Sequence, residues 1–106
     1  MINENTLELF NSDSCLLNLA RGGIVNEAAL LTALEKGAIA GAALDCFEEE
    51  PYHGRLVQLD NVILTQHMGS CSFDCRAAME IEATKDMINF FKGDPLANQV
   101  TDDEIF

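Results

Sequence analysis

The sequence has no tryptophan, only two prolines, and six lysines and arginines against 18 aspartates and glutamates. With a formal net charge of -12, the chain has no basic patch to neutralise phosphates, which argues against nucleic acid and anionic membrane surfaces as partners. No apolar run is long enough to cross a bilayer, and no basic, then apolar, signal pattern opens the chain. We therefore expect no membrane association and a reducing, cytoplasmic location.

The four cysteines could form two disulfides, but their positions favour thiols. Cys15 and Cys46 lie in or beside apolar runs predicted to be buried, where a cysteine behaves as a small hydrophobic residue. Cys71 and Cys75 have the spacing of half a zinc site, and His67 lies four residues before them. No second pair completes that site, so we expect no metal.

The chain is long enough for one small domain. Hydrophobic residues make up 48% of the sequence and charged residues 23%, a balance typical of a globular protein. We expect this domain to cover residues 1–100, followed by a loose acidic tail at residues 101–106.

The apolar pattern predicts helices alternating with strands. Helices are expected at residues 3–10, 26–36 and 73–92, with a short helical turn at 56–59. Short apolar runs at residues 15–20, 39–44 and 62–65 are typical of strands buried on both faces. This order predicts an α/β fold with parallel strands and right-handed crossovers.

Helix-capping residues support these limits. Asn3, Asn26 and Ser72 can each accept a hydrogen bond from the first turn of the helix that follows. Gly37 and Gly93 are well placed to end the second and third helices. The third helix has a wide apolar face, from which we expect it to pack against a sheet.

Chemically capable residues follow each predicted strand. Arg21 follows the first strand, Asp45 and Glu50 follow the second, and His67 follows the third. In parallel sheets the ligand crevice lies at the carboxyl ends of the strands. We therefore expect these four residues to converge on one edge of the sheet.

Each of these residues also has a structural interpretation. A lone histidine at a strand end is often structural, Glu50 could belong to a solvated acidic turn, and Arg21 could form a structural salt bridge. Together they suit one reaction. An arginine fork holds a carboxylate, while a histidine oriented by a glutamate exchanges a hydroxyl proton near neutral pH.

Three blocks of the chain resemble, in order, those of the D-isomer-specific 2-hydroxyacid dehydrogenases. Residues 18–30, NLARGGIVNEAAL, resemble N-x-A-R-G-x-x-V-D-E-x-A-L. Residues 39–51, IAGAALDCFEEEP, resemble the block G-A-x-x-D-V-F-x-x-E-P. Residues 61–70, NVILTQHMGS, resemble N-V-x-x-T-P-H-x-G-G, and the likeness extends over residues 2–100.

The resemblance implies roles for matched positions. It makes Arg21 the clamp on the substrate carboxylate, Glu50 the partner of the histidine, and His67 the acid–base catalyst. It also implies NAD as cofactor, and a contact with its nicotinamide end at Leu19, Ala20, Arg21, Asp45, His67, Gly69 and Ser70.

The chain also departs from the family pattern. Asn26, Gln66 and Ser70 replace the aspartate, proline and glycine, respectively, that are usual in the family, but no catalytic group is lost. The G-x-G-x-x-G turn that receives the cofactor pyrophosphate is missing, as is the substrate-binding domain. We therefore expect the C-terminal portion of a Rossmann-like NAD-binding domain: a partial three-layer unit with about three parallel strands and flanking helices.

The resemblance implies an NAD-dependent oxidoreductase that interconverts a D-2-hydroxy acid and its 2-keto acid by hydride transfer. Among the substrates of the family, phosphoglycerate is favoured, as in a phosphoglycerate-dehydrogenase-like enzyme, and formate is the least favoured. The preference for NAD or NADP is left open. We expect this fragment alone to be inactive, because hydride transfer needs a cofactor held at both ends. The alternative is a non-catalytic dinucleotide-sensing or dimerisation module, since an incomplete sheet leaves an edge that favours a homodimer.

Overall fold

The computed structural model describes residues 1–101, which form two compact units. The first unit is Met1–Gly69, and the second begins at Ser70. Of residues 1–101, the first unit contains the three strands and the hydrophobic core, and the second contains one long helix.

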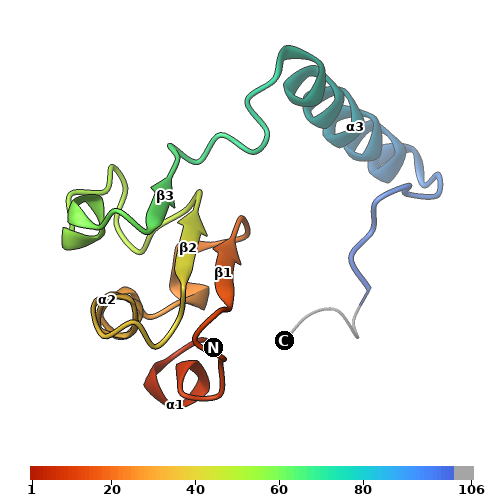
Figure 1. Cartoon of the computed structure of the whole chain (residues 1–106). Coiled ribbons are helices and arrows are strands. Elements are labelled where there is room, and N and C mark those ends of the chain that lie inside the picture. The colour runs from red at the N-terminus through yellow and green to blue at the C-terminus, as the bar shows by residue number, and fades with distance from the viewer. Residues whose placement is uncertain (102–106) are drawn as a thin grey trace. The chain divides into compact units, whose positions relative to one another are not determined.

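The first unit is built on a three-stranded parallel sheet (Figure 1). Strands β1 (Cys15–Asn18), β2 (Gly41–Leu44) and β3 (Val62–Leu64) lie in the order β1-β2-β3. The alternation of strands and helices and the parallel pairing confirm the predicted α/β class. Each strand is shorter than its apolar run.

Only one face of this sheet is covered within residues 1–69. Leu16 of β1 pairs in register with Ala42 and belongs with it to the buried core. The next row has Leu17 and Ile63 on either side of β2, and these side chains are 65% and 67% exposed. The prediction of strands buried on both faces is therefore wrong for β1 and β3 within the first unit, where residues 1–69 pack on one side of the sheet only.

The first helix is shorter than predicted. Asn3 caps α1 (Glu4–Leu7), and its side chain accepts a hydrogen bond from the Thr6 amide. The chain then tightens, because the amides of Leu9 and Phe10 donate to carbonyls three residues back. This i→i−3 pattern ends the α-helix before the predicted limit.

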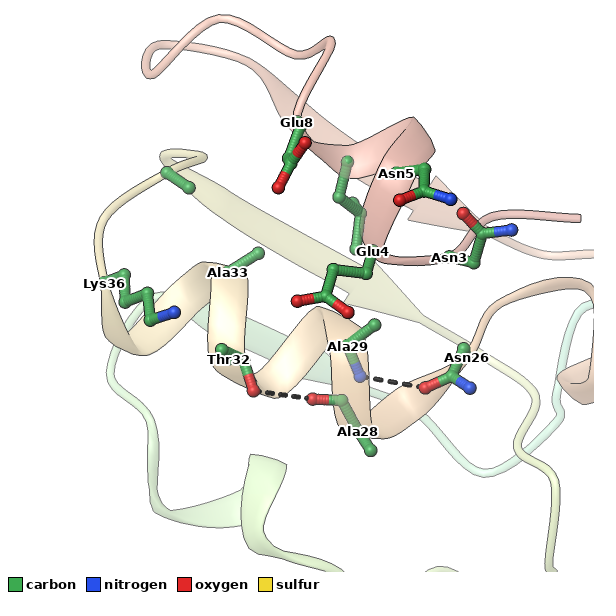
Figure 2. Close-up of a pocket in the computed structure, with 12 residues that line it drawn as sticks. Asn3, Glu4, Asn5, Glu8, Asn26, Ala28, Ala29, Thr32, Ala33 and Lys36 are labelled. Carbon is green, nitrogen blue, oxygen red and sulfur yellow. Dashed lines mark hydrogen bonds between the residues drawn. The ribbon is translucent and has the colours of Figure 1, made fainter.

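Helix α2 (Glu27–Glu35) covers the core face of the sheet. Its cap is the predicted one: the Ala29 amide donates to Asn26 Oδ1 over 2.9 Å (Figure 2). Leu30 and Leu34 are buried, and a glycine at φ 66°, Gly37, follows the helix. The short 3-10 helices η1 (Gly22–Ile24) and η2 (Arg55–Gln58) complete this unit.

The core joins α2 to the strands and to the loops beyond them. Its most deeply buried side chains are those of Leu30, Ile39, Leu44 and Leu56. Cys46 is buried as predicted, whereas Cys15, at the start of the edge strand β1, is exposed, so that prediction is wrong for it. No disulfide joins the cysteines of residues 1–101.

The second unit contains helix α3 (Phe73–Lys92). Ser72 caps it by accepting a hydrogen bond from the Cys75 amide, and Gly93, at φ 74°, ends it. Both caps are as predicted. Within the second unit none of its residues is buried, and the packing predicted for its apolar face stays a prediction.

No described helix is both long enough and apolar enough to cross a membrane. The acidic tail predicted at residues 101–106 lies outside the described residues, apart from Thr101.

Candidate active site

The carboxyl ends of the three strands meet at one edge of the sheet, here called the rim. Arg21 follows β1, Asp45 follows β2, and His67 follows β3. Glu50 reaches the rim from the loop after β2. The convergence expected from parallel strands is thus present in the first unit.

His67 and Glu50 form the central pair of the rim. His67 Nδ1 lies 3.0 Å from each carboxylate oxygen of Glu50. The Phe47 amide donates to Glu50 Oε1 over 3.0 Å and fixes the carboxylate from the other side. Both side chains are partly exposed, so the pair is open to a small molecule.

The electrostatics of the pair set the tautomer of the imidazole. Hydrogen bonds from His67 and then from the Phe47 amide lower the pKa of Glu50 below its ordinary value. An ionised carboxylate only accepts hydrogen bonds, so the proton on the neutral ring lies on Nδ1 of His67. Nε2 is then the nitrogen on which a proton can be exchanged.

Asp45 directly follows β2 and is buried. Its Oδ1 accepts hydrogen bonds from Thr65 Oγ1 at 2.5 Å and from the Met68 amide at 2.9 Å. Its Oδ2 accepts from the Gly69 amide at 2.9 Å. The Thr65 hydroxyl contributes most, and the Met68 amide next, to lowering the pKa of Asp45, so the buried carboxyl is ionised and satisfied.

His67 has an unusual backbone conformation. Its φ is 51°, in the left-handed region, which non-glycine residues seldom adopt. The amides of the next two residues, Met68 and Gly69, both point at Asp45. The loop that carries His67 is therefore anchored to the end of β2.

Arg21 lies on a tight turn after β1. The side chain of the buried Asn18 holds both sides of this turn, donating to the Arg21 carbonyl and accepting from the Ala20 amide. The Arg21 guanidinium is exposed and donates to the Ala20 carbonyl over 2.6 Å. Within residues 1–101 it forms no salt bridge, so the structural alternative considered for it is not observed.

A glycine brings the Arg21 turn against the Glu50 loop. A Cβ added to Gly22 would lie 1.9 Å from the Phe47 carbonyl oxygen, so no larger residue fits there. The amide of Phe47 in turn holds Glu50. Backbone contact thus links the loop that carries Arg21 to the loop that carries Glu50.

The other residues predicted to contact the cofactor differ in their exposure and in their contacts. Leu19 and Ala20 are exposed beside Arg21, and Gly69 contacts Asp45. Ser70 begins the second unit, so its position relative to the rim is not described.

The roles of two residues at the rim were not predicted from the sequence. Asn18 and Thr65 organise the turns that carry Arg21 and His67, although neither was singled out. Both stand within the blocks that resemble the family, and a short polar side chain at the end of an apolar strand was the available signal.

Two cavities differ in their chemistry. One of about 690 Å³ lies beside the central pair and is lined by Phe47, Glu50, Tyr52, Leu64 and His67. The other, of about 620 Å³, lies between α1 and α2 and includes none of the predicted site residues (Figure 2). Of these two cavities, the first contains the His67–Glu50 pair, and the second contains no histidine.

Comparison with known proteins gives consistent matches. The family described as D-isomer specific 2-hydroxyacid dehydrogenase, NAD binding domain, matches residues 1–69. Glyoxylate reductase of Pyrococcus furiosus is 48% identical over 95 residues, which are 89% of this chain and 28% of that protein. D-3-phosphoglycerate dehydrogenase of Bacillus subtilis is 39% identical over 101 residues, 94% of this chain and 19% of that protein.

Solved structures agree with the sequence matches. The NADPH-dependent glyoxylate/hydroxypyruvate reductase of Sinorhizobium meliloti, in complex with NADP and malonate, has a TM-score of 0.86 at 37% identity. That match covers 94% of this chain and 32% of the other. The chain spans less than a third of the length of these relatives.

Proposed function

The chain belongs to the D-isomer specific 2-hydroxyacid dehydrogenase family, and we propose that it forms the acid–base half of an NAD-dependent active site. The reaction is the interconversion of a D-2-hydroxy acid and its 2-keto acid. The observation that carries this proposal is the pairing of ionised Glu50 with Nδ1 of His67 at the rim.

The described residues divide the chemistry between them. His67 Nε2 takes the hydroxyl proton during oxidation and returns it during reduction, while Glu50 keeps the ring oriented. Arg21 binds the substrate carboxylate through its exposed guanidinium. NAD, when bound, accepts or supplies the hydride.

The residues beside the pair fit the nicotinamide end of this cofactor. An ionised carboxylate has about four acceptor positions. Asp45 uses three of them on Thr65, Met68 and Gly69, which leaves one for a carboxamide N–H. We assign the other cofactor contacts to Leu19, Ala20, Arg21, His67, Gly69 and Ser70.

Among candidate substrates, we rank glyoxylate first. The glyoxylate reductase of Pyrococcus furiosus is 48% identical to this chain, against 39% for the D-3-phosphoglycerate dehydrogenase of Bacillus subtilis. Both substrates offer the carboxylate that Arg21 would bind, so 3-phosphohydroxypyruvate, the keto acid that corresponds to 3-phosphoglycerate, stays in the test panel.

The test uses a chimera in which this segment replaces the matching 95 residues of the Pyrococcus furiosus enzyme. NADH-dependent reduction is measured with glyoxylate, hydroxypyruvate and 3-phosphohydroxypyruvate. His67→Gln is expected to lower kcat about 10²–10⁴-fold. His53→Gln is the comparison variant, since it removes the other histidine that lines this cavity and leaves the Glu50–His67 pair in place.

Arg21→Gln in the same chimera is expected to raise KM for the keto acid more than it lowers kcat. Normal turnover in the His67→Gln chimera would refute the acid–base assignment. Binding of NADH without turnover in the unmutated chimera would favour a dinucleotide-sensing module instead.

Three further properties belong to this proposal. We assign residues 1–100 to the C-terminal portion of an NAD-binding domain and place the protein in the cytoplasm, supported by cysteines that form no disulfide within residues 1–101. We also propose a homodimer, supported by the exposed apolar side chains of Leu17 and Ile63 on the sheet. Sedimentation equilibrium tests the dimer, and a single monomeric species would contradict it.

A further inference from the structure

We propose that Thr65 and Asp45 form a clamp that holds the His67 backbone in the left-handed conformation needed for its imidazole to meet Glu50. Thr65 is then a positioning residue, which acts on His67 through Asp45. The consequence for catalysis rests on the proposed function, but the clamp itself does not.

The first step of the argument is the cost of the His67 conformation. A positive φ places Cβ close to the backbone and is unfavourable for a residue with a side chain. Among the non-glycine residues of the described chain, His67 alone has one, at 51°. Such a conformation persists only where the surroundings hold it in place.

The second step is what the turn at His67 makes possible. The amides of Met68 and Gly69 both donate to one carboxylate, each over 2.9 Å. Successive amides that point the same way form an anion-binding concavity, and a residue in the left-handed region is part of that geometry. Here the bound anion is Asp45 of the same chain.

The third step is the anchoring of Asp45 itself. Its side chain is buried, and its amide donates to the Asn18 carbonyl over 3.0 Å, directly after β2. Thr65 donates its hydroxyl to the same carboxylate, while its amide donates to the Leu44 carbonyl. The chain is thus tied to Asp45 on both sides of His67, at residue 65 and at residues 68 and 69.

One other cause could hold the conformation. In this second explanation, the Glu50–His67 hydrogen bond pulls the ring, and with it the backbone, into place. The two explanations differ in which substitution releases the Met68 and Gly69 amides. The clamp requires Thr65 and Asp45, whereas the pull requires Glu50.

The primary experiment is amide hydrogen exchange by NMR on the 106-residue chain. Exchange at Met68 and Gly69 is divided by exchange at Ala42, whose amide donates to the Asn61 carbonyl away from His67, so that global destabilisation cancels. Thr65→Val, which removes only the hydroxyl, is expected to raise both ratios about tenfold or more. Thr65→Ser, which keeps the hydroxyl, is expected to restore them to within about threefold of the original values.

Two more variants separate the explanations. Asp45→Asn replaces one carboxylate oxygen with an NH₂ group, which cannot accept a hydrogen bond from a backbone amide. Met68 or Gly69 then loses its acceptor, and the exchange ratio at that residue is expected to rise. If Thr65→Val unfolds the chain and leaves no protected amides, the Met68 and Gly69 exchange ratios are compared between Asp45→Asn and the unmodified chain instead. Glu50→Gln is expected to leave both ratios unchanged, and a rise in that variant alone would overturn the clamp.

The second readout is the imidazole tautomer, measured from the ¹⁵N shifts of the ring. The chain has only two histidines, so His53→Gln assigns the His67 signals. The Nδ1–H form is expected in the unmodified chain and in Thr65→Ser, and a mixture of tautomers in Thr65→Val. Unchanged exchange ratios and tautomer in both Thr65→Val and Asp45→Asn would refute the proposal.

These outcomes are independent of the catalytic test. An active His67→Gln chimera with intact clamp signals would refute the proposed function only. Loss of activity in that chimera, together with NMR signals that change in neither Thr65→Val nor Asp45→Asn, would refute the clamp only.

Discussion

The two units use apolar residues in opposite ways. Helix α2 has nine residues and buries Leu30, Ala33 and Leu34 in the core of the first unit. Helix α3 has twenty residues, which include Phe73, Phe90 and Phe91, and none of them is buried within the second unit. An apolar helical pattern therefore indicates a helix face that can be covered, but it does not specify the neighbour on which the strength of packing depends.

The largest expected effect is in the core of the first unit. Leu30→Ala empties a position that is 0% exposed and is expected to lower the free energy of unfolding by about 2–5 kcal/mol. Phe91→Ala in α3 removes a larger side chain that is 80% exposed, so a change within about 0.5 kcal/mol is expected. Urea titrations followed by circular dichroism measure both variants, and equal losses of unfolding free energy would contradict this contrast between the units.

The next effect is at the link between the Arg21 and Glu50 loops. Gly22→Ala would force its Cβ against the Phe47 carbonyl and is expected to cost about 1–3 kcal/mol or more. Gly23→Ala is the matched control, because its Cβ would meet nothing within 4 Å. Thermal unfolding compares the two, and the expectation fails if Gly23→Ala is the more destabilising.

A smaller effect is expected at the helix caps. Ser72→Ala removes the acceptor for the Cys75 amide, and Asn26→Ala removes that for the Ala29 amide; each change costs about 1 kcal/mol. The stability lost in the two variants should appear in different measurements. Asn26→Ala should lower the cooperative midpoint of the first unit, while Ser72→Ala should only fray α3, as read from amide exchange by residue.

The smallest effect concerns acid stability. Because the folded pKa of Glu50 lies below its ordinary value of 4.5, its ion pair contributes stability above that pH. This contribution is lost as the pH falls from 4.5 through the folded pKa. The stability difference between the unmodified chain and Glu50→Gln should therefore shrink on acidification, and the effect is small because the pair is partly exposed. A difference that grows towards low pH would reverse the sign expected here.

Much of the fold follows from local chemistry in the sequence. Asn3, Asn26, Ser72 and Gly93 each specify a helix end by a hydrogen bond or a backbone angle within a few residues, and each was predicted. The convergence of Glu50 and His67 also followed, because parallel strands bring their carboxyl ends together.

Properties that depend on distant neighbours could not be predicted. Leu17 reads like any buried strand residue, and only the coverage of the sheet shows that it is exposed. Thr65 and Asn18 gain their roles from hydrogen bonds to groups whose positions the fold sets, so their short polar side chains carried little information alone.

The turn held by Asn18 has a practical consequence for enzyme engineering. Its side chain fixes the backbone at Ala20 and Arg21, while the side chains of Leu19 and Ala20 remain exposed. Backbone placement and side-chain identity are therefore separable at these two positions. A library that varies Leu19 and Ala20 but retains Asn18 can alter which ligands fit beside Arg21 without moving the arginine itself.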